Sequence, residues 1–230
     1  MNAQLHLDDN WASYFDPSTD TLHFQNLESQ NLEFKVKVRN FRDPYFTPDV
    51  IMTNEKTVLY TDINNKGVPA ILKYDRNEKN VTVLLKSAMA TQRLDFCQNA
   101  SNIFIMEFGV KESNRGTVIT QIIKENLNID NANVIYQSRY NDLGSLICKN
   151  QNELYFVKNT YEKTGRRTSE AARLNLKNKS VEILSDLKFV SHIMRFDESL
   201  LIPLKGEYYV LKGKSNLSRS DNIEIQKQDN

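Results

Sequence analysis

Residues 97–106 read Cys-Gln-Asn-Ala-Ser-Asn-Ile-Phe-Ile-Met, and this stretch recurs in altered form along the chain. Residues 148–157 read Cys-Lys-Asn-Gln-Asn-Glu-Leu-Tyr-Phe-Val, residues 52–61 read Met-Thr-Asn-Glu-Lys-Thr-Val-Leu-Tyr-Thr, and residues 194–203 read Met-Arg-Phe-Asp-Glu-Ser-Leu-Leu-Ile-Pro. A fainter copy, with one extra residue in its turn, lies at 15–24. The five copies start 37, 45, 51 and 46 residues apart. Self-similarity at such periods indicates a repeat architecture.

Each copy continues with two more apolar segments. In the second copy, residues 70–75 and 81–85 are apolar segments separated by a turn at 76–80, and the fourth copy repeats this pattern at 172–176 and 181–184. Alternation and β-branched residues favour strands, and clusters of Asn, Lys and Asp favour turns. Four strands in a unit of about 45 residues are typical of a β-propeller blade.

The sequence therefore predicts an all-β fold: one five-bladed β-propeller domain of four-stranded antiparallel blades covering residues 1–230. The predicted blades span approximately 5–40, 48–87, 92–138, 144–186 and 189–227. Residues Gln4 to Leu7 are expected to supply a closing strand to the last blade. The alternative is a β-sandwich in which the similarity between segments is accidental.

Composition and charge exclude several classes of protein. The chain has 230 residues, of which 40% are hydrophobic and 26% charged, which is ordinary for a globular protein. Its 30 Lys and Arg against 29 Asp and Glu give a net charge of +1, so no basic field points to nucleic acid. No apolar run approaches the roughly 18 residues of a membrane span. We expect no signal peptide in this chain, and secretion or periplasmic export only if a leader was removed.

The second copy carries motifs of a known propeller class. Residues 44–49 read Pro-Tyr-Phe-Thr-Pro-Asp, residues 58–62 read Val-Leu-Tyr-Thr-Asp, and residues 71–75 read Ile-Leu-Lys-Tyr-Asp. This pattern resembles TolB/WD40-like repeats, although no glycine follows Asp49 and the first element precedes the strand by several residues too many. The resemblance implies a propeller fold and partner binding rather than chemistry.

The two cysteines, Cys97 and Cys148, occupy repeat positions where other copies carry Met52 and Met194. A position that accepts Cys or Met is expected to be buried and apolar. Equivalent positions of neighbouring blades are expected to lie beyond the roughly 7 Å that a disulfide tolerates. The sequence therefore predicts two free thiols in the core. The three histidines are scattered without ligand spacing, so we predict neither a metal site nor a cofactor.

Two Asp-Pro pairs raise an enzymatic alternative. Residues 41–44, Phe-Arg-Asp-Pro, and 15–17, Phe-Asp-Pro, resemble motifs of five-bladed glycoside hydrolases. That resemblance implies Asp16, Asp43 and Glu107 as the catalytic acids, since glycoside cleavage needs paired carboxylates. However, the repeat places Asp16 after the first strand of its blade and Asp43 before the first strand of its own. The two should lie at opposite ends, where both serve as turn residues.

Loop lengths give a different candidate site. The predicted loops between second and third strands are 64–67, 109–116 and 159–170, and the last two are long and charged. Long charged loops on a rigid scaffold are where binding usually resides, and basic groups beside an aromatic suit an anionic partner. The predicted binding residues are Lys111, Arg115, Tyr161, Lys163, Arg166 and Arg167.

The sequence thus favours a non-catalytic propeller that acts as a binding module or scaffold. It would recognise a protein or an anionic glycan through its long-loop face. Two alternatives stay open: a glycoside hydrolase-like propeller that acts on a glycan, and a lectin-like propeller with a carbohydrate pocket in each blade.

Overall fold

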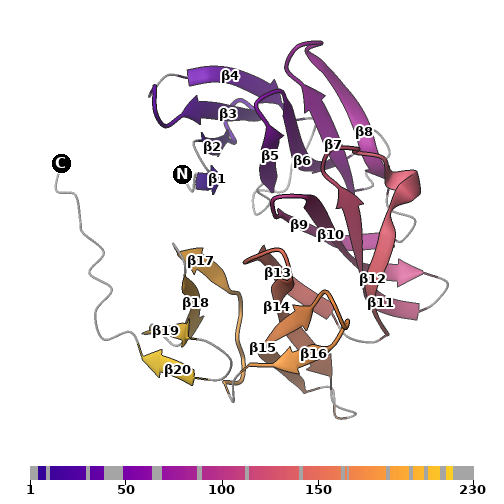
Figure 1. Cartoon of the computed structure of the whole chain (residues 1–230), viewed down its shortest axis with the longest axis vertical. Helices are drawn as coiled ribbons and strands as arrows, with labels where there is room; N and C mark the ends of the chain where they lie inside the picture. Colours follow the sequence, from indigo (N-terminus) through magenta and orange to yellow (C-terminus); the bar gives the residue numbers. More distant parts are fainter. Residues whose placement is uncertain are drawn as a thin grey trace. The chain divides into compact units, whose positions relative to one another are not determined.

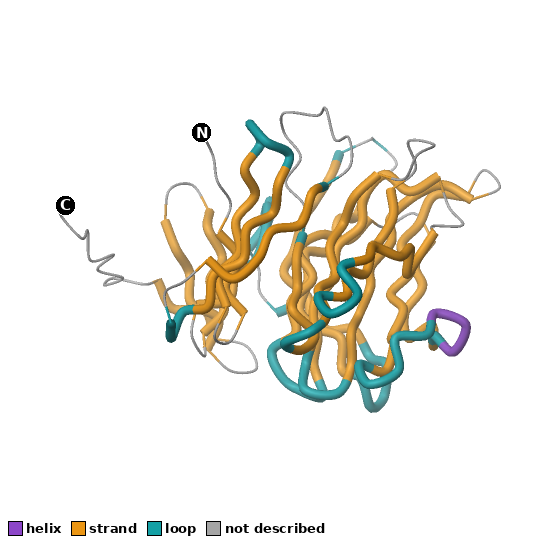
Figure 2. Tube along the Cα trace, turned by 90° about the horizontal axis from the view of Figure 1, so that it is seen from above, coloured by secondary structure: helices purple, strands orange, loops and turns teal. Residues whose placement is uncertain are grey.

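The backbone of the computed structural model is almost entirely β-strand in its described parts (Figure 2). One short 3-10 helix, η1 (Ile129–Asn131), is the exception among them. No helix in these parts is long and apolar enough to cross a membrane. The structure describes residues 5–8, 11–29, 32–38, 49–63, 69–86, 90–111, 114–139, 142–161, 164, 166–184, 187–196, 199–204, 207–212 and 216–219.

The chain divides into two compact units, residues 1–139 and residues 140–230. The first unit contains three four-stranded sheets, here called blades 1, 2 and 3 (Figure 1). Blade 1 consists of β1 (Leu5–Asp8), β2 (Trp11–Asp16), β3 (Thr21–Asn26) and β4 (Leu32–Lys37). Blade 2 consists of β5 (Val50–Asn54), β6 (Thr57–Ile63), β7 (Pro69–Asp75) and β8 (Asn80–Lys86). Blade 3 consists of β9 (Ala90–Gln98), β10 (Asn102–Lys111), β11 (Asn114–Ile123) and β12 (Asn133–Arg139).

The second unit contains blades 4 and 5, which have the same construction. Blade 4 consists of β13 (Asp142–Cys148), β14 (Glu153–Tyr161), β15 (Arg167–Asn175) and β16 (Val181–Ile183). Blade 5 consists of β17 (Met194–Phe196), β18 (Ser199–Leu204), β19 (Glu207–Lys212) and β20 (Asn216–Arg219).

In every blade the strands lie side by side in chain order and neighbouring strands are antiparallel. Within the first unit, the first strand of blade 2 contacts those of blades 1 and 3, and within the second unit the first strands of blades 4 and 5 contact each other. Five such sheets confirm the predicted fold class, a five-bladed all-β propeller.

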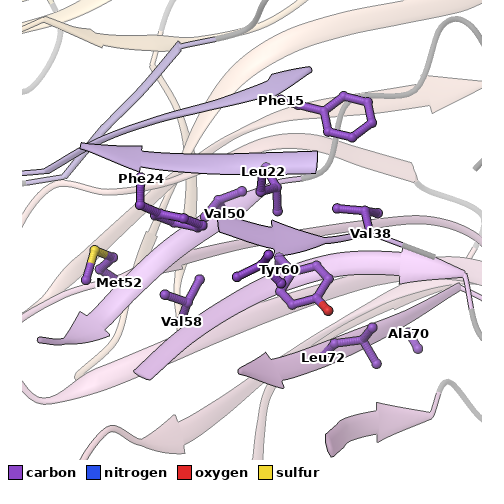
Figure 3. Packing of buried hydrophobic residues seen from close by; sticks show 11 residues of the cluster. Phe15, Leu22, Phe24, Val38, Val50, Met52, Val58, Tyr60, Ala70 and Leu72 are labelled. Atoms are coloured by element: carbon purple, nitrogen blue, oxygen red, sulfur yellow. The ribbon is translucent and has the colours of Figure 1, made fainter. Parts of the chain in front are cut away.

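Apolar side chains of blades 1 and 2 form one buried cluster (Figure 3). Blade 1 contributes Phe15, Leu22, Phe24, Val36 and Val38, and blade 2 contributes Val50, Met52, Val58, Tyr60, Ala70 and Leu72. Alternate residues of a strand point to opposite faces of its sheet. The contributors from each central strand are therefore two residues apart, as Leu22 and Phe24 or Val58 and Tyr60 are.

The central strands of blade 2, β6 and β7, are buried on both faces. Leu59 and Ile71, which alternate with the residues of the first cluster, pack with apolar side chains of blade 3 in a second cluster. A central strand with both faces covered needs an unbroken apolar run instead of simple alternation. This explains why the second strand of each repeat unit reads as three or four apolar residues. In the second unit, Tyr155, Val157 and Ala171 of blade 4 pack with Leu200 and Ile202 of blade 5.

Side chains of Asn and Asp close many of the turns. The Asn54 side-chain oxygen accepts a hydrogen bond from the Lys56 N–H at 2.8 Å. The Asp75 carboxylate accepts hydrogen bonds from the N–H groups of Asn77 and Glu78. Asn99, Asn150 and Asn175 accept in the same way. Asn and Asp favour such turns because their short side chains reach the backbone two residues on. Several of the 26 asparagines of the chain thus have a structural use at the blade ends.

The structure corrects the predicted role of the N-terminal strand. β1 pairs with β2 inside blade 1, and blade 5 is formed from its own four strands. Residues 15–24 therefore form the hairpin between the second and third strands of blade 1. The repeat alignment matched them to hairpins that, in the other four blades, join the first and second strands. Both hairpins consist of an apolar segment, a polar turn and an apolar segment, so the sequence pattern alone does not distinguish them.

The prediction of two free thiols is wrong, because Cys97 and Cys148 are both disulfide-bonded. Met52 and Cys148 are buried as expected, whereas Cys97 and Met194 are half-buried. All four positions lie on the first strands of their blades. The prediction assumed that equivalent positions on consecutive blades are far apart, but the first strands of consecutive blades contact each other within each unit.

Candidate functional site

The predicted loop 64–67 lies outside the described residues, and the predicted loop 109–116 is mostly strand. β10 continues to Lys111 and β11 begins at Asn114, with Lys111 opposite Asn114 and Val110 opposite Arg115. Only residues 112–113 lie between these strands, and they are outside the described residues. Lys111 and Arg115 are thus at the end of an extended hairpin, where only their backbone is described.

The predicted loop 159–170 is also shorter than expected. β14 continues to Tyr161 and β15 begins at Arg167, and these two residues are paired across the strands. Tyr161 is 40% exposed, and Arg166 and Arg167 are exposed beside it. Lys163 lies outside the described residues. The structure therefore places three of the predicted binding residues together at one end of blade 4.

The connection from β16 to β17 lies at the same end of the blade. The Val190 N–H donates a hydrogen bond to the Ser169 carbonyl at 3.0 Å, and Lys188 forms an ion pair with Glu170. The Arg166 guanidinium carbon lies 5.8 Å from the centroid of the Phe189 ring. We call this surface the blade-4 tip and define it as Tyr161, Arg166, Arg167, Lys188 and Phe189.

Phe189 has an unusual backbone conformation for an aromatic residue. Its φ is 64°, in the left-handed region, and its side chain is 53% exposed. A bulky residue there carries a cost of roughly 1–2 kcal/mol. The next residue, Val190, is buried in the cluster of the second unit, and Leu187 packs against that cluster. The buried Val190 and the partly buried Leu187 anchor the chain on both sides of Phe189, and the kink between them turns Phe189 outward.

Arg167 is fixed by neutral acceptors. Its Nε and Nη2 donate to the Asn159 side-chain oxygen at 3.1 and 2.9 Å, and Nε also donates to the Ser169 hydroxyl at 3.1 Å. Both acceptors belong to buried residues. Among the residues that the structure describes, no carboxylate lies within ion-pair distance of Arg166 or Arg167. Two cations of the tip therefore keep their charge uncompensated, whereas Lys188 is paired.

The carboxylates of the enzymatic alternative have a different setting. Asp16 ends β2, and its carboxylate accepts hydrogen bonds from the Ser18 N–H at 2.9 Å, the Ser18 hydroxyl at 2.6 Å and the Thr19 hydroxyl at 2.8 Å. The hydrogen bonds from Ser18 and Thr19 lower the pKa of Asp16 to about 2. Asp43 lies outside the described residues, and Glu107 is a half-buried residue within β10.

The placement of Asp16 corrects one argument from the repeat. Asp16 follows the second strand of blade 1, and the Val38 N–H at the end of β4 donates to the Asp20 carbonyl at 2.9 Å. The connection from β4 to β5, which contains Asp43, therefore starts at the same end of the blade as Asp16. The predicted separation of the two residues to opposite ends rested on the misaligned first copy. No group of three or more metal-ligating residues occurs among the described side chains.

Sequence reasoning missed Lys188 and Phe189. Phe189 lies in a short segment between two strands, where an apolar residue is ordinarily assigned to the core. The one signal for the site is the segment Leu187-Lys-Phe-Val190, in which three apolar residues surround one lysine without strand alternation.

Comparison with known proteins adds the fold and no family. No family model matches the chain. No curated protein matches it either. Among solved structures, the tricorn protease has a TM-score of 0.64 at 10% identity, covering 95% of this chain and 27% of that chain. The Pyrococcus horikoshii acylaminoacyl peptidase has a TM-score of 0.60 at 16% identity, covering 96% and 40%.

A third structure is matched over most of its length. It is the β-propeller domain of the Trilobed protease from Pyrococcus furiosus, with a TM-score of 0.59 at 13% identity, covering 96% of this chain and 72% of that one. This chain is similar to β-propellers in fold. It spans about a quarter and two fifths of the first two proteins, and identities this low carry the fold alone.

Proposed function

We propose that this chain is a non-catalytic propeller that binds a macromolecular partner, a protein or an anionic glycan, through the blade-4 tip. The observation that carries the proposal is Phe189, a half-exposed aromatic residue in a left-handed backbone conformation with Arg166 over its ring. Neither Arg166 nor the adjacent Arg167 has a carboxylate partner among the described residues. Backbone strain of this kind occurs preferentially at functional sites.

The physical argument is that binding sites need rigid and partly apolar groups before the partner arrives. Aromatic residues and arginine supply most of the binding energy at protein interfaces. Phe189 is held by buried neighbours and Arg167 by two buried acceptors, so neither side chain needs much further ordering on binding. Groups that are ordered in advance lose less entropy in the complex.

The alternatives have less support. The hydrogen bonds that lower the pKa of Asp16 to about 2 keep it ionised near neutral pH, so it cannot be the general acid there, and glycoside cleavage would need that acid from another residue. A lectin-like propeller would present similar pockets in each blade. However, the turn of blade 1 that corresponds to residues 162–166 is Pro17-Ser-Thr-Asp20, which has neither an aromatic residue nor an arginine.

The resemblance to TolB/WD40-like repeats is part of the same proposal. Two of the motifs that suggested it, residues 58–62 and 71–75, lie on β6 and β7, adjacent strands of blade 2. The first motif lies mostly outside the described residues. The class resemblance supports partner binding in general and does not select the blade.

Site-specific photo-cross-linking tests the proposal. A benzophenone amino acid at position 189 should form an adduct with one macromolecule in an extract of the source organism. The matched control is the same amino acid at Val83 on β8, an apolar position with a similar exposure of 44%. Equal labelling from both positions, or none from position 189, would contradict a specific site at the tip.

A further inference from the structure

We infer that the partner of the blade-4 tip is an acidic polypeptide segment that carries an aromatic or aliphatic side chain next to its carboxylates. This inference rests on the proposed function and narrows the choice that it leaves between protein and glycan. The argument comes from the polar groups that the tip offers and from those that it already uses internally.

Among the side chains that the structure describes at the tip, most are hydrogen-bond donors. Arg166 and Arg167 carry no acceptor atoms. Two described acceptors at this end of the blade are already used, because the Asn159 side-chain oxygen accepts two N–H groups of Arg167 and the Glu170 carboxylate pairs with Lys188. A neutral sugar presents hydroxyl groups that both donate and accept, and it would find few partners here. A ligand rich in acceptors, such as one with carboxylates, fits this surface.

The arginine side chains also suit carboxylates by geometry. Two of the five N–H groups of Arg167 are directed inward to Asn159 and Ser169, which fixes the plane of its guanidinium. The N–H groups that these contacts do not use can meet a carboxylate side by side, an arrangement that favours planar anions. Arg166 adds a second, less constrained charge over the Phe189 ring.

The aromatic part favours a polypeptide over an anionic glycan. Phe189 has no polar atom and is 53% exposed, and Tyr161 is 40% exposed on the neighbouring hairpin. Contact with both rings requires apolar surface in the ligand. A polypeptide supplies it from one side chain beside its acidic groups, whereas a heavily charged polysaccharide has few apolar groups to bury. Combined aromatic and arginine character is also typical of protein interfaces.

Binding of defined polymers tests this inference. The probes are fluorescein-labelled poly-glutamate, a random copolymer of glutamate and tyrosine of equal length, heparin, and polygalacturonate, measured by fluorescence anisotropy at low and high salt. We expect the glutamate–tyrosine copolymer to bind most tightly. Phe189→Ala should remove its advantage over poly-glutamate, a loss of about tenfold for an interface aromatic. Salt should weaken the binding of every probe, because it screens exposed charges.

Charge reversal provides the second arm. R166E/R167E should weaken copolymer binding by about tenfold or more at low salt. Because Arg167 also hydrogen-bonds buried groups, R166E alone is the second variant. Among the described residues, the Arg166 side chain contacts the Phe189 ring and makes no hydrogen bond. The matched control is K177E/K179E, which changes the same number of charges at exposed residues in the turn between β15 and β16, at the other end of blade 4. It should leave binding unchanged, and circular dichroism should show every variant folded.

The possible results separate the inference from the proposed function. Tighter binding of heparin or polygalacturonate through the same arginines would overturn the polypeptide inference and leave binding at the tip intact. A copolymer advantage that survives Phe189→Ala would also overturn the inference. Equal weakening by K177E/K179E and R166E/R167E would overturn both, because it would reduce the binding to non-specific charge.

Discussion

Two arginine–aromatic contacts, one in each unit, use the same chemistry for different ends. In the first unit, the Arg76 guanidinium carbon lies 4.2 Å from the Phe34 ring centroid and 5.2 Å from that of Trp11. In the second unit, Arg166 lies 5.8 Å from the Phe189 ring centroid. Arg76 also donates a hydrogen bond to the Glu55 carbonyl at 2.6 Å, a contact that joins two turns of blade 2.

The surroundings of the rings make the difference. Phe34 stacks on Phe24 at 4.4 Å between centroids, and Trp11, Phe34 and Tyr74 all pack against the buried cluster of blades 1 and 2. Phe189 instead projects from a kink, with half of its surface exposed. A cation over a ring therefore has no fixed role. Where the ring packs against a core the pair stabilises the fold, and where the ring is exposed the pair remains available to a partner.

The largest expected difference concerns the rings. Phe34→Ala should lower the free energy of unfolding by about 2–4 kcal/mol, because it removes aromatic surface packed against a core. Phe189→Ala should change the same free energy by less than about 0.5 kcal/mol, the usual range for a surface position. Urea unfolding of the two variants measures both values. A cost at position 189 equal to that at 34 would show that Phe189 is structural and would remove the contrast.

Substitution of the two arginines should change the free energy of unfolding in the same order as substitution of the rings, but by smaller amounts. Arg76→Ala removes a cation–π contact and a hydrogen bond to a carbonyl, and should cost about 1–2 kcal/mol of unfolding free energy. Arg166→Ala should cost about 0–0.5 kcal/mol, because its ring contact is long and exposed. Thermal unfolding in low and high salt compares them. The two contacts would be equivalent if both variants lost the same stability.

Glycine at position 189 should sharpen the contrast, because it should stabilise the fold where the other substitutions destabilise it. Glycine accepts a positive φ without the cost of roughly 1–2 kcal/mol that other residues carry. Its greater freedom in the unfolded chain lowers the resulting gain in stability by about 0.5–1 kcal/mol. Phe189→Gly should therefore raise the unfolding free energy by up to about 1 kcal/mol while it weakens binding of the glutamate–tyrosine copolymer. Alanine at this position retains the strain and serves as the control. A destabilised glycine variant would mean that the ring supports the kink.

The smallest expected effect is a pH dependence in blade 1. His23 is 8% exposed, its ring stacks on Tyr14 at 4.6 Å, and neither ring nitrogen has a hydrogen-bond partner among the described residues. Burial lowers the pKa of His23 below its ordinary value of 6.5, and the charge of Lys35 adds to this, while Asp16 opposes it.

Because the unfolded chain binds the proton more readily, stability should be full above about pH 6.5 and fall as the pH decreases below that value. His23→Phe should flatten the dependence of Tm on pH between 7 and 5. The contribution of Asp16 lies at lower pH, where its carboxylate becomes protonated, and does not interfere. An unchanged slope in the variant would assign the pH dependence to another group.

Burial explains which parts of the fold the sequence could predict. Blades 2 to 5 were recognisable because strands covered on both faces give apolar runs such as Val58 to Tyr60, bounded by turn residues such as Asn54 and Asp75. Blade 1 was shifted by one strand because β1 has only four residues and its end is acidic. A segment this short has too little alternation to be recognised without its pairing partner.

The candidate site was predictable only in its charges. Arg166 and Arg167 lie in a charged stretch at the turn into β15, and such a stretch is predicted to be exposed. Phe189 gives the opposite signal, because an apolar residue is expected inside. Its exposure depends on the burial of Val190 and on a positive φ, and both depend on contacts with residues distant in sequence. The disulfide-bonded cysteines were missed for a similar reason, since repeat spacing does not give distances between strands.

Each sheet is formed from strands that follow one another directly in the chain, with no strand exchanged between the first and last blades of the described structure. Pairing between neighbouring segments closes short loops and is favourable for rapid folding. During synthesis, a blade can complete its sheet as soon as its fourth strand has left the ribosome, before the next blade has emerged. Folding could therefore proceed blade by blade from the N-terminus, which would limit the time that unpaired strand edges such as β8 are exposed to other chains.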